Sequence, residues 1–355
     1  MHGIYQMTYL QAVVIGLIQG LTELFPISSL GHTVLIPSWM GGTWATLVRQ
    51  ESSAESPYLA FIVGLHLATA LVLVGYYFKT WVRIIRGFFT SIIHRRVESA
   101  DEKLAWLLII ATIPVGIAGL ALEHTFRVLF AKPLAAAIFL TINGGILAGA
   151  EVLRRRRPDA PDEIAEHEPL NQPVRVAEGT QAAQSAWSGE TVPSGAAAPP
   201  GARHAAPSAL RGERDERDVV LDEAAEQRLA GVGFVSALWI GASQILALFA
   251  GISREGVTMA GGLVRGLSHE DALRFSFLLS TPVILAAGLF KLSDLTGSHG
   301  AGIHGQVIAG SIAAAATSLF AVVFLSRYFR TRTLTPFAIY CVAAGLISII
   351  RFGFF

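Results

Sequence analysis

The stretch QGLTELFPISSLGHT, residues 19–33, interrupts an apolar N-terminal run with groups that lipid does not favour. It contains a carboxylate, a proline, two serines and a histidine: Glu23, Pro26, Ser28, Ser29 and His32. Ionisable and polar side chains at membrane depth are costly, and they generally line a cavity or pair with one another. The stretch therefore predicts a polar site inside a membrane protein.

The rest of the chain has the composition of a polytopic membrane protein. Of its 355 residues, 52% are hydrophobic and only 15% are charged, and the mean hydropathy is +0.53. A spanning helix needs about 20 mostly apolar residues. The stretches that qualify, the last of them short, are 58–78, 104–122, 133–153, 232–249, 273–290, 307–325 and 337–350.

Other features exclude several classes of protein. A net charge of +1, with the basic residues in loops, does not provide the basic surface that nucleic acid requires. The one cysteine, Cys341, lies in an apolar stretch, so a disulfide framework within the chain is excluded and a core role is expected. The N-terminus MHGIYQMTYL lacks a cationic signal region, and we expect it to be retained.

One segment differs from the apolar parts. Residues 154–230 are rich in Pro, Ala, Gly, Glu and Arg and have almost no aromatic residues, which predicts a disordered linker. The chain then divides into an N-terminal membrane half (1–153), a cytoplasmic linker (154–230) and a C-terminal membrane half (231–355).

The basic residues predict the topology. Lys and Arg concentrate in cytoplasmic loops, which places residues 79–103, the linker and residues 327–332 inside, and 123–132 and 293–306 outside. Two apparent helices, 232–249 and 273–290, lie between the linker and residues 293–306. Two full crossings would return the chain to the cytoplasmic side, although residues 293–306 are expected outside. Either one segment is re-entrant or VTMAGGLVRGL, residues 257–267, adds a further partial pass. The polar stretch GISREGVT, residues 251–258, falls at this place and implies a cavity.

An internal repeat connects the two polar stretches. Residues 15–33 align without a gap on residues 240–258, and apolar composition alone does not explain the identity of Gln, Ser and Thr in one register. Inverted repeats with broken helices place binding sites near the bilayer midplane. The identical pairs are Ile15/Ile240, Gly16/Gly241, Gln19/Gln244, Leu21/Leu246, Ile27/Ile252, Ser28/Ser253, Gly31/Gly256 and Thr33/Thr258.

The two copies carry complementary chemistry. The first has Glu23, two serines and His32, whereas the second has Arg254, hydroxyl groups at Ser253 and Thr258, and the carboxylate of Glu255. Arginine is suited to a bidentate grip on phosphate oxygens, and serine hydroxyls with backbone N–H groups complete such a site. Gln19 and Glu23 share a helix face, and Mg²⁺ prefers one or two carboxylates plus substrate phosphates. Phosphoryl chemistry fits both copies.

Structural alternatives exist for each residue taken alone. A single Arg or Glu can anchor a helix at the membrane interface, and His32 can be a hydrogen-bonded interior histidine. For His66, in FIVGLHLATAL, a packing or helix–helix hydrogen-bonding role is favoured over a catalytic one. The combination of groups favours a site.

At these residues the sequence resembles the bacterial undecaprenyl pyrophosphate phosphatase family, also called the bacitracin-resistance phosphatases. QGLTELFPISSLGH is similar to its first motif, AGISREG to its second, Pro-Gly-x-Ser-Arg-Ser-Gly, and RFSFLLSTPVILAAG and LTPFAIY look like further family segments. The resemblance implies an all-α polytopic enzyme of interlocked inverted repeats with two re-entrant broken helices. It implies a site open to the outer face of the bacterial plasma membrane and recycling of the carrier lipid for cell-wall synthesis.

Carried over by position, Glu23, Ser29, His32 and Arg254 are the expected catalytic residues. Gln19, Ser28, Gln244, Ser253 and Thr258 are expected to bind substrate. The chain departs from the family pattern at Gln19, a neutral member of the acidic pair, at Ala250, which replaces a proline, and at Glu255, which replaces a serine. Glu255 is expected to join Glu23 as a metal ligand, with pairing to Arg254 as the alternative.

The resemblance implies hydrolysis of undecaprenyl pyrophosphate with a divalent cation, Mg²⁺ or Ca²⁺. Ser29 and His32 both remain candidates for the nucleophile. A polyprenyl-phosphate transporter or flippase is the alternative, because inverted repeats with broken helices also build transporters; a structural scaffold would leave the polar repeat unexplained. The expected partners are a polyprenyl pyrophosphate lipid, the bilayer and, as an open alternative, a second copy in a homodimer, with no nucleic acid.

Overall fold

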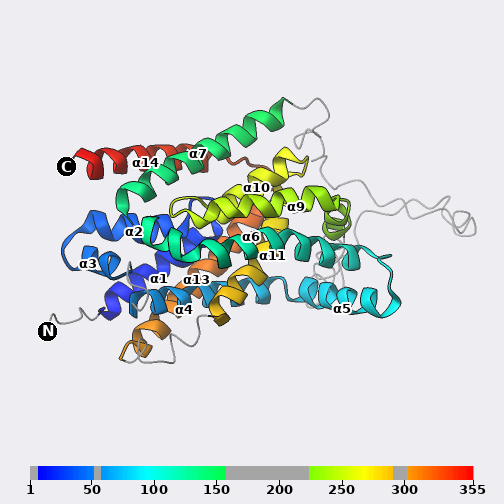
Figure 1. Cartoon of the computed structure of the whole chain (residues 1–355), viewed down its shortest axis with the longest axis horizontal. Helices are drawn as coiled ribbons and strands as arrows, with labels where there is room; N and C mark the ends of the chain where they lie inside the picture. The colour runs from blue at the N-terminus through cyan, green and yellow to red at the C-terminus, as the bar shows by residue number, and fades with distance from the viewer. Residues whose placement is uncertain (1–6, 52–56, 131, 157–223, 291–301, 355) are drawn as a thin grey trace, which may run out of the picture. The chain divides into compact units, whose positions relative to one another are not determined.

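The computed structural model describes residues 7–51, 57–130, 132–156, 224–290 and 302–354 (Figure 1). The described residues contain helices and no strand, and the helices discussed below belong to one compact unit. Most of the linker expected at 154–230, and most of the loop expected at 293–306, lie outside the described residues.

The membrane-crossing helices confirm the prediction of an all-α polytopic protein. Five described helices are long and apolar enough to span a bilayer: α6 (Ala100–Phe130), α7 (Pro133–Arg155), α11 (His269–Phe290), α13 (His304–Tyr328) and α14 (Thr335–Phe354). Another long apolar helix, α4 (Pro57–Tyr76), turns by 83° into α5 (Phe78–His94). Its 20 residues give α4 a length of about 30 Å, enough to cross.

The two polar stretches each form a broken helix. In the first, α1 (Tyr9–Leu24) is followed by α2 (Ser29–Met40) and the short α3 (Gly42–Glu51). In the second, α9 (Phe234–Ser243) tightens into the 3₁₀ helix η1 (Gln244–Leu248), and α10 (Arg254–Val264) follows after a turn. The stretch 232–249, which also qualified as a span, is therefore not one continuous helix. If α4 crosses, each half has three crossings and one broken segment, and this odd number inverts one half relative to the other.

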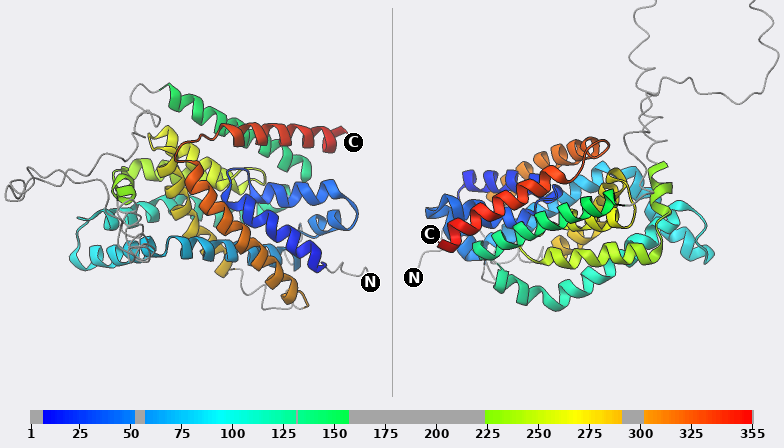
Figure 2. Two further views of the ribbon diagram at one scale, coloured as in Figure 1. Left: turned by 180° about the vertical axis from the view of Figure 1, so that it is seen from behind. Right: turned by 90° about the horizontal axis from the view of Figure 1, so that it is seen from above.

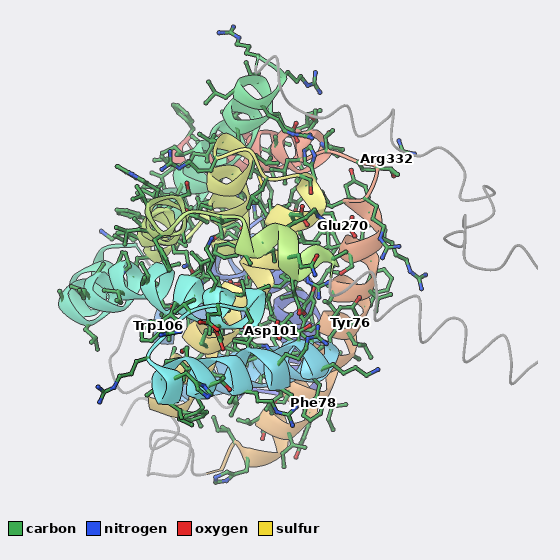
Figure 3. All side chains as sticks on the ribbon, turned by 90° about the vertical axis from the view of Figure 1, so that its right-hand side faces the viewer. Tyr76, Phe78, Asp101, Trp106, Glu270 and Arg332 are labelled. Carbon is green, nitrogen blue, oxygen red and sulfur yellow. The ribbon has the colours of Figure 1, made fainter. Side chains whose placement is uncertain are left out.

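The basic segments lie together at one end of the helices. Arg154 at the end of α7 lies 2.6 Å from Nδ1 of His269 at the start of α11, and Glu151 accepts a hydrogen bond from the backbone of Leu334. Arg83 of α5 pairs with Glu226, which also contacts Arg274 of α11. Figure 3 views this end, with Asp101, Glu270 and Arg332 labelled. The N-terminal helix does not start at this end. It starts beside the first turn of α13, where the Gln306 amide donates to the carbonyl of Met7 at 3.1 Å.

The helix pairs follow the internal repeat. Helix α1 packs along α13, and its counterpart α9 packs along α6, while α7 packs on α14 and α4 on α11. Figures 1 and 2 show α7 and α14 side by side. Gly16 and Gly241, which the repeat aligns, lie at equivalent contacts: a Cβ at Gly16 would meet the carbonyl oxygen of Gly310, and one at Gly241 that of Ala111. Small residues thus allow each broken helix to approach the other half closely.

We expect Gly16→Ala to destabilise the protein by about 1–3 kcal/mol, because a methyl group would push α1 away from α13. Gly149→Ala is the matched control, since Gly149 of α7 has open space where its Cβ would stand, and alanine gains about 0.5–1 kcal/mol over glycine within a helix. Thermal unfolding in detergent, followed by circular dichroism, should show opposite shifts. An equal rise in the unfolding temperature of both variants would contradict the close packing of α1 against α13 at Gly16.

Candidate functional site

The first turn of the site lies between α1 and α2. Helix α1 starts at a capping box made by Thr8 and Gln11 and stops at Leu24, two residues before Pro26, which has no N–H to continue a helix. Ser28 then caps α2, with φ of 72°, and its hydroxyl accepts a hydrogen bond from the N–H of Gly31 at 3.2 Å. Helix α2 thus begins at Ser29, and its first turn is buried at Ser29, Gly31 and His32.

The second turn repeats this design. Ser253 caps α10 and accepts a hydrogen bond from the N–H of Gly256 at 3.1 Å, as Ser28 does from Gly31. Gly251 has φ of 111°, a conformation that favours glycine. The gapless alignment of the two stretches is therefore reproduced by equivalent caps and equivalent hydrogen bonds.

The two turns contact each other directly. The N–H of Gly251 donates to the hydroxyl of Ser28 at 3.2 Å, and the Ser253 hydroxyl donates to the carbonyl of Phe25 at 3.3 Å. Asn143 of α7 bridges them, since its amide donates to the carbonyl of Pro26 and accepts from the N–H of Ser253, both at 3.0 Å. The halves of the chain therefore meet in one polar centre.

A cluster around Glu23 forms one side of this centre. The Ser29 hydroxyl and the Gln19 amide both donate to Oε2 of Glu23, the latter at 2.9 Å. His66 of α4 joins them, with its Nε2 at 3.3 Å from the same oxygen and 3.1 Å from Nε2 of Gln19. Its other nitrogen, Nδ1, donates to the carbonyl of Ile62 at 2.9 Å, which fixes the ring.

Several buried polar atoms of the site have no hydrogen-bond partner among the described residues. They are Nη1 of Arg254 at the start of α10, both polar atoms of the Gln244 side-chain amide, and Oε1 of Gln19. Buried polar groups cost free energy unless something satisfies them, so these atoms indicate a polar ligand.

The cavity between these groups has a volume of about 590 Å³. Its polar lining includes Glu23, Ser29, His66, Gln244 and Arg254, together with Ser28 and Ser253. The remaining walls are apolar and come from α4, α6, η1 and α11; they include Val63, Val115, Leu120, Leu248, Pro282 and Ile284. The arrangement suits an amphiphile with an anionic head and a long apolar chain.

Four of the expected site residues do not line the cavity, and one of them, Gln19, is buried beside Glu23. His32 is buried against α14, where its Nδ1 donates to the carbonyl of Ser28 and its ring stacks on Tyr340, whose hydroxyl lies 2.8 Å from Nε2. Glu255 is fully buried and receives a hydrogen bond from Ser276 of α11. Thr258 is buried farther along α10. The structure does not pair Ser29 with His32, since Ser29 donates to Glu23 and His32 contacts Tyr340. The sharing of a metal by Glu23 and Glu255 stays a prediction.

Two residues have a larger role in the structure than the sequence predicts. The sequence favours a packing or hydrogen-bonding role for His66, yet this residue lines the cavity and contacts Glu23. Asn143 is absent from the residues expected at the site, although its hydrogen bonds connect the two turns. Both are single polar side chains inside an otherwise apolar spanning segment, which generally marks a functional or packing site.

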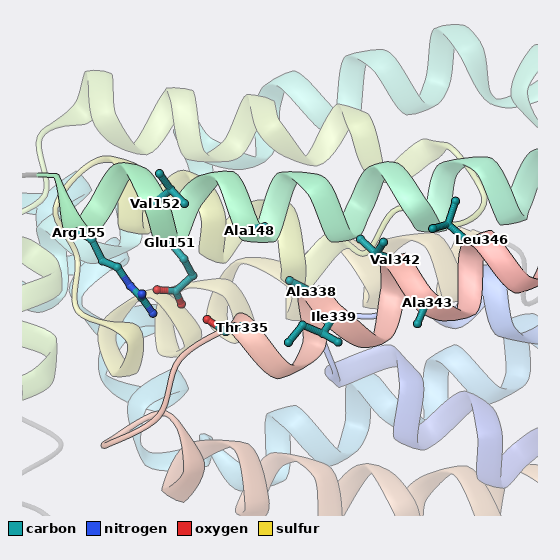
Figure 4. Close-up of a pocket in the computed structure, with 10 residues that line it drawn as sticks. All are labelled: Ala148, Glu151, Val152, Arg155, Thr335, Ala338, Ile339, Val342, Ala343 and Leu346. Carbon is teal, nitrogen blue, oxygen red and sulfur yellow. The ribbon is translucent and has the colours of Figure 1, made fainter.

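A second hollow of about 560 Å³ lies between α7 and α14 (Figure 4). It is lined mainly by alanine and branched apolar residues, with Glu151, Arg155 and Thr335 at one end. It contains none of the expected site residues.

The described residues define a class of protein: an α-helical membrane protein in which two broken-helix repeats share one buried polar cavity. Residues 12–174 and 212–347 match the family described as bacitracin resistance protein BacA, and the chain belongs to this family.

Similar proteins support this assignment. The chain is 51% identical to undecaprenyl-diphosphatase 2 of Frankia alni, over 98% of this chain and 99% of that protein. It is 49% identical to undecaprenyl-diphosphatase of Mycolicibacterium paratuberculosis, over 97% of each chain. A more distant relative, undecaprenyl-diphosphatase of Gluconobacter oxydans, is 33% identical over 96% of this chain and 98% of that protein.

We expect Ser28→Ala to lower stability by roughly 2–4 kcal/mol, because the N–H groups of Gly31 and Gly251 lose their acceptor inside the protein. Ser38→Ala is the matched control on the same helix, since that hydroxyl donates only to the carbonyl of Val34. Thermal unfolding in detergent measures both. Equal, small shifts in the two variants would show that Ser28 does not hold the turns together.

Proposed function

We propose that the chain hydrolyses undecaprenyl diphosphate to undecaprenyl phosphate and inorganic phosphate. The observation that carries this proposal is the arrangement in the cavity: Ser29 donates to Glu23, and the same cavity contains Arg254, whose Nη1 has no protein partner. A nucleophile with a proton acceptor shares the space with a phosphate-binding group. The similar proteins, which are named undecaprenyl-diphosphatases, indicate the substrate.

The cavity suits this substrate at both ends. The diphosphate would occupy the polar end, where Arg254, Gln244 and the N-termini of α2 and α10 offer donors. The apolar walls from α4, α6 and α11 would accept the first part of the isoprenoid chain. An anionic head would also supply partners for the polar atoms that have none among the described residues.

The chemistry follows from the contacts of Ser29. Its oxygen attacks the terminal phosphorus, the bond from that phosphorus to the bridging oxygen breaks, and undecaprenyl phosphate leaves. The hydroxyl proton passes to the Glu23 carboxylate, which already accepts its hydrogen bond. Water then attacks the phosphoserine, which releases inorganic phosphate and restores the hydroxyl. Arg254 stabilises the charge that develops on the phosphoryl oxygens.

We also propose that these residues bind a divalent cation. The carboxylate of Glu23 and, once its amide has turned its oxygen toward Glu23 in place of its nitrogen, Gln19 would be oxygen ligands of the kind that Mg²⁺ prefers. A bound cation would supply charge neutralisation at the phosphate oxygens.

We place the protein in the bacterial plasma membrane with the cavity open to the outer side. The basic segments share one end of the helices, and basic segments remain cytoplasmic. The cavity is lined by Ile62 near the start of α4 and by Ala286 and Gly288 near the end of α11, which belong to the opposite end. A homodimer stays a prediction. The relatives give no support to the transporter alternative.

Phosphate release from undecaprenyl diphosphate by the purified protein, with and without Mg²⁺, tests the proposal. We expect turnover in the wild type and a loss of about three orders of magnitude or more in Ser29→Ala, with Ser29→Ala/Glu23→Gln hardly worse, because the two residues act as one unit. Ser38→Ala, on the same helix but outside the cavity, should keep wild-type turnover. Lipid binding without phosphate release would instead favour a transporter.

A further inference from the structure

The polar atoms of Gln19, Glu23 and His66 form a small triangle at the edge of the cavity. Oε2 of Glu23 lies 2.9 Å from the Gln19 amide nitrogen and 3.3 Å from Nε2 of His66, and these two nitrogens are 3.1 Å apart. Ligands bound at about 2.1 Å to one octahedral cation stand about 3 Å from each other. The Gln19 amide nitrogen donates within this group, and the same spacing would suit ligands of a single cation if the amide turned its oxygen inward.

The orientation of His66 supports this interpretation. Its Nδ1 donates to the carbonyl of Ile62, so in the neutral ring Nε2 carries a lone pair, and that lone pair faces Glu23 and Gln19. Metal-binding histidines generally donate their second ring nitrogen to a carbonyl or carboxylate in this way. His66 is also accessible from the cavity, with its side chain 23% exposed, whereas Glu23 is 4% exposed.

Gln19 completes the set. Its Oε1 is buried without a hydrogen-bond partner. Rotation of the amide by half a turn would exchange Oε1 with Nε2 and direct the oxygen toward Glu23 and His66. The chain would then offer one carboxylate oxygen, one amide oxygen and one imidazole nitrogen, with the Ser29 hydroxyl bonded to the same Glu23 oxygen.

We propose that His66 is a metal ligand and that it makes the site selective for Mn²⁺ over Ca²⁺. Calcium is bound almost entirely by oxygen, whereas imidazole suits first-row transition metals. The inference rests on the proposed function only for the substrate phosphates that would fill the remaining positions. The protein groups alone define the preference, so metal binding is measurable without lipid.

Electron paramagnetic resonance of purified protein titrated with Mn²⁺ in detergent tests this inference. We expect a bound Mn²⁺ whose pulsed spectrum shows coupling to an imidazole nitrogen, and a Ca²⁺ affinity, measured by competition, at least about tenfold weaker. In His66→Gln, the nitrogen coupling should vanish and Mn²⁺ affinity should fall by about tenfold or more, with little change for Ca²⁺. His304→Gln is the control, because His304 is exposed at the start of α13.

Absence of nitrogen coupling in the wild type would overturn the inference, and this reading does not depend on whether the variant folds. Coupling that persists in His66→Gln would also overturn it, since another histidine would be the ligand. Failure of the proposed function is distinguishable: a protein with the nitrogen-coupled Mn²⁺ site that releases no phosphate would keep the metal site and lose the activity. A protein that releases phosphate but shows no nitrogen coupling would keep the proposed function and overturn the assignment of His66 as a metal ligand.

Discussion

The hydrogen bonds of Asn143 hold together the two turns on which the site depends. A helix that breaks inside a membrane leaves backbone groups without partners, and each costs several kcal/mol in hydrocarbon. Here each broken helix supplies partners for the other: Asn143 joins the carbonyl of Pro26 to the N–H of Ser253, and Ser28 accepts from Gly251. Neither turn is satisfied without the opposite half. The polar cavity is therefore a product of the interlocked repeat.

This arrangement also explains the division of chemistry between the halves. The first turn positions Ser29 beside Glu23, and the second places Arg254 at the same cavity. The repeat aligns Glu23 with Leu248 and Ser29 with Arg254, so each half contributes groups to the cavity that the other half lacks. The capping serines Ser28 and Ser253, in contrast, are identical in the two copies.

Much of this organisation was predictable from sequence. The gapless match between residues 15–33 and 240–258 indicated two equivalent turns, and the charge pattern required a re-entrant segment or a further partial pass. The direction of individual side chains was harder to predict. Glu255 directly follows Arg254 on a helix, and neighbouring helical residues point about 100° apart, so the two do not face the same cavity. The orientation of His32 depends on Tyr340, far along the chain, and that contact leaves no local pattern in the sequence.

The two turns act as one site because Asn143 joins them. We would measure kcat/KM for phosphate release by Asn143→Ala in preparations that keep the helix content of the wild type. Small displacements of catalytic groups cost about a hundredfold in rate, so we expect a loss of at least about that size with the protein still inserted. Wild-type kcat/KM in this variant would show that Asn143 does not join the turns into one site.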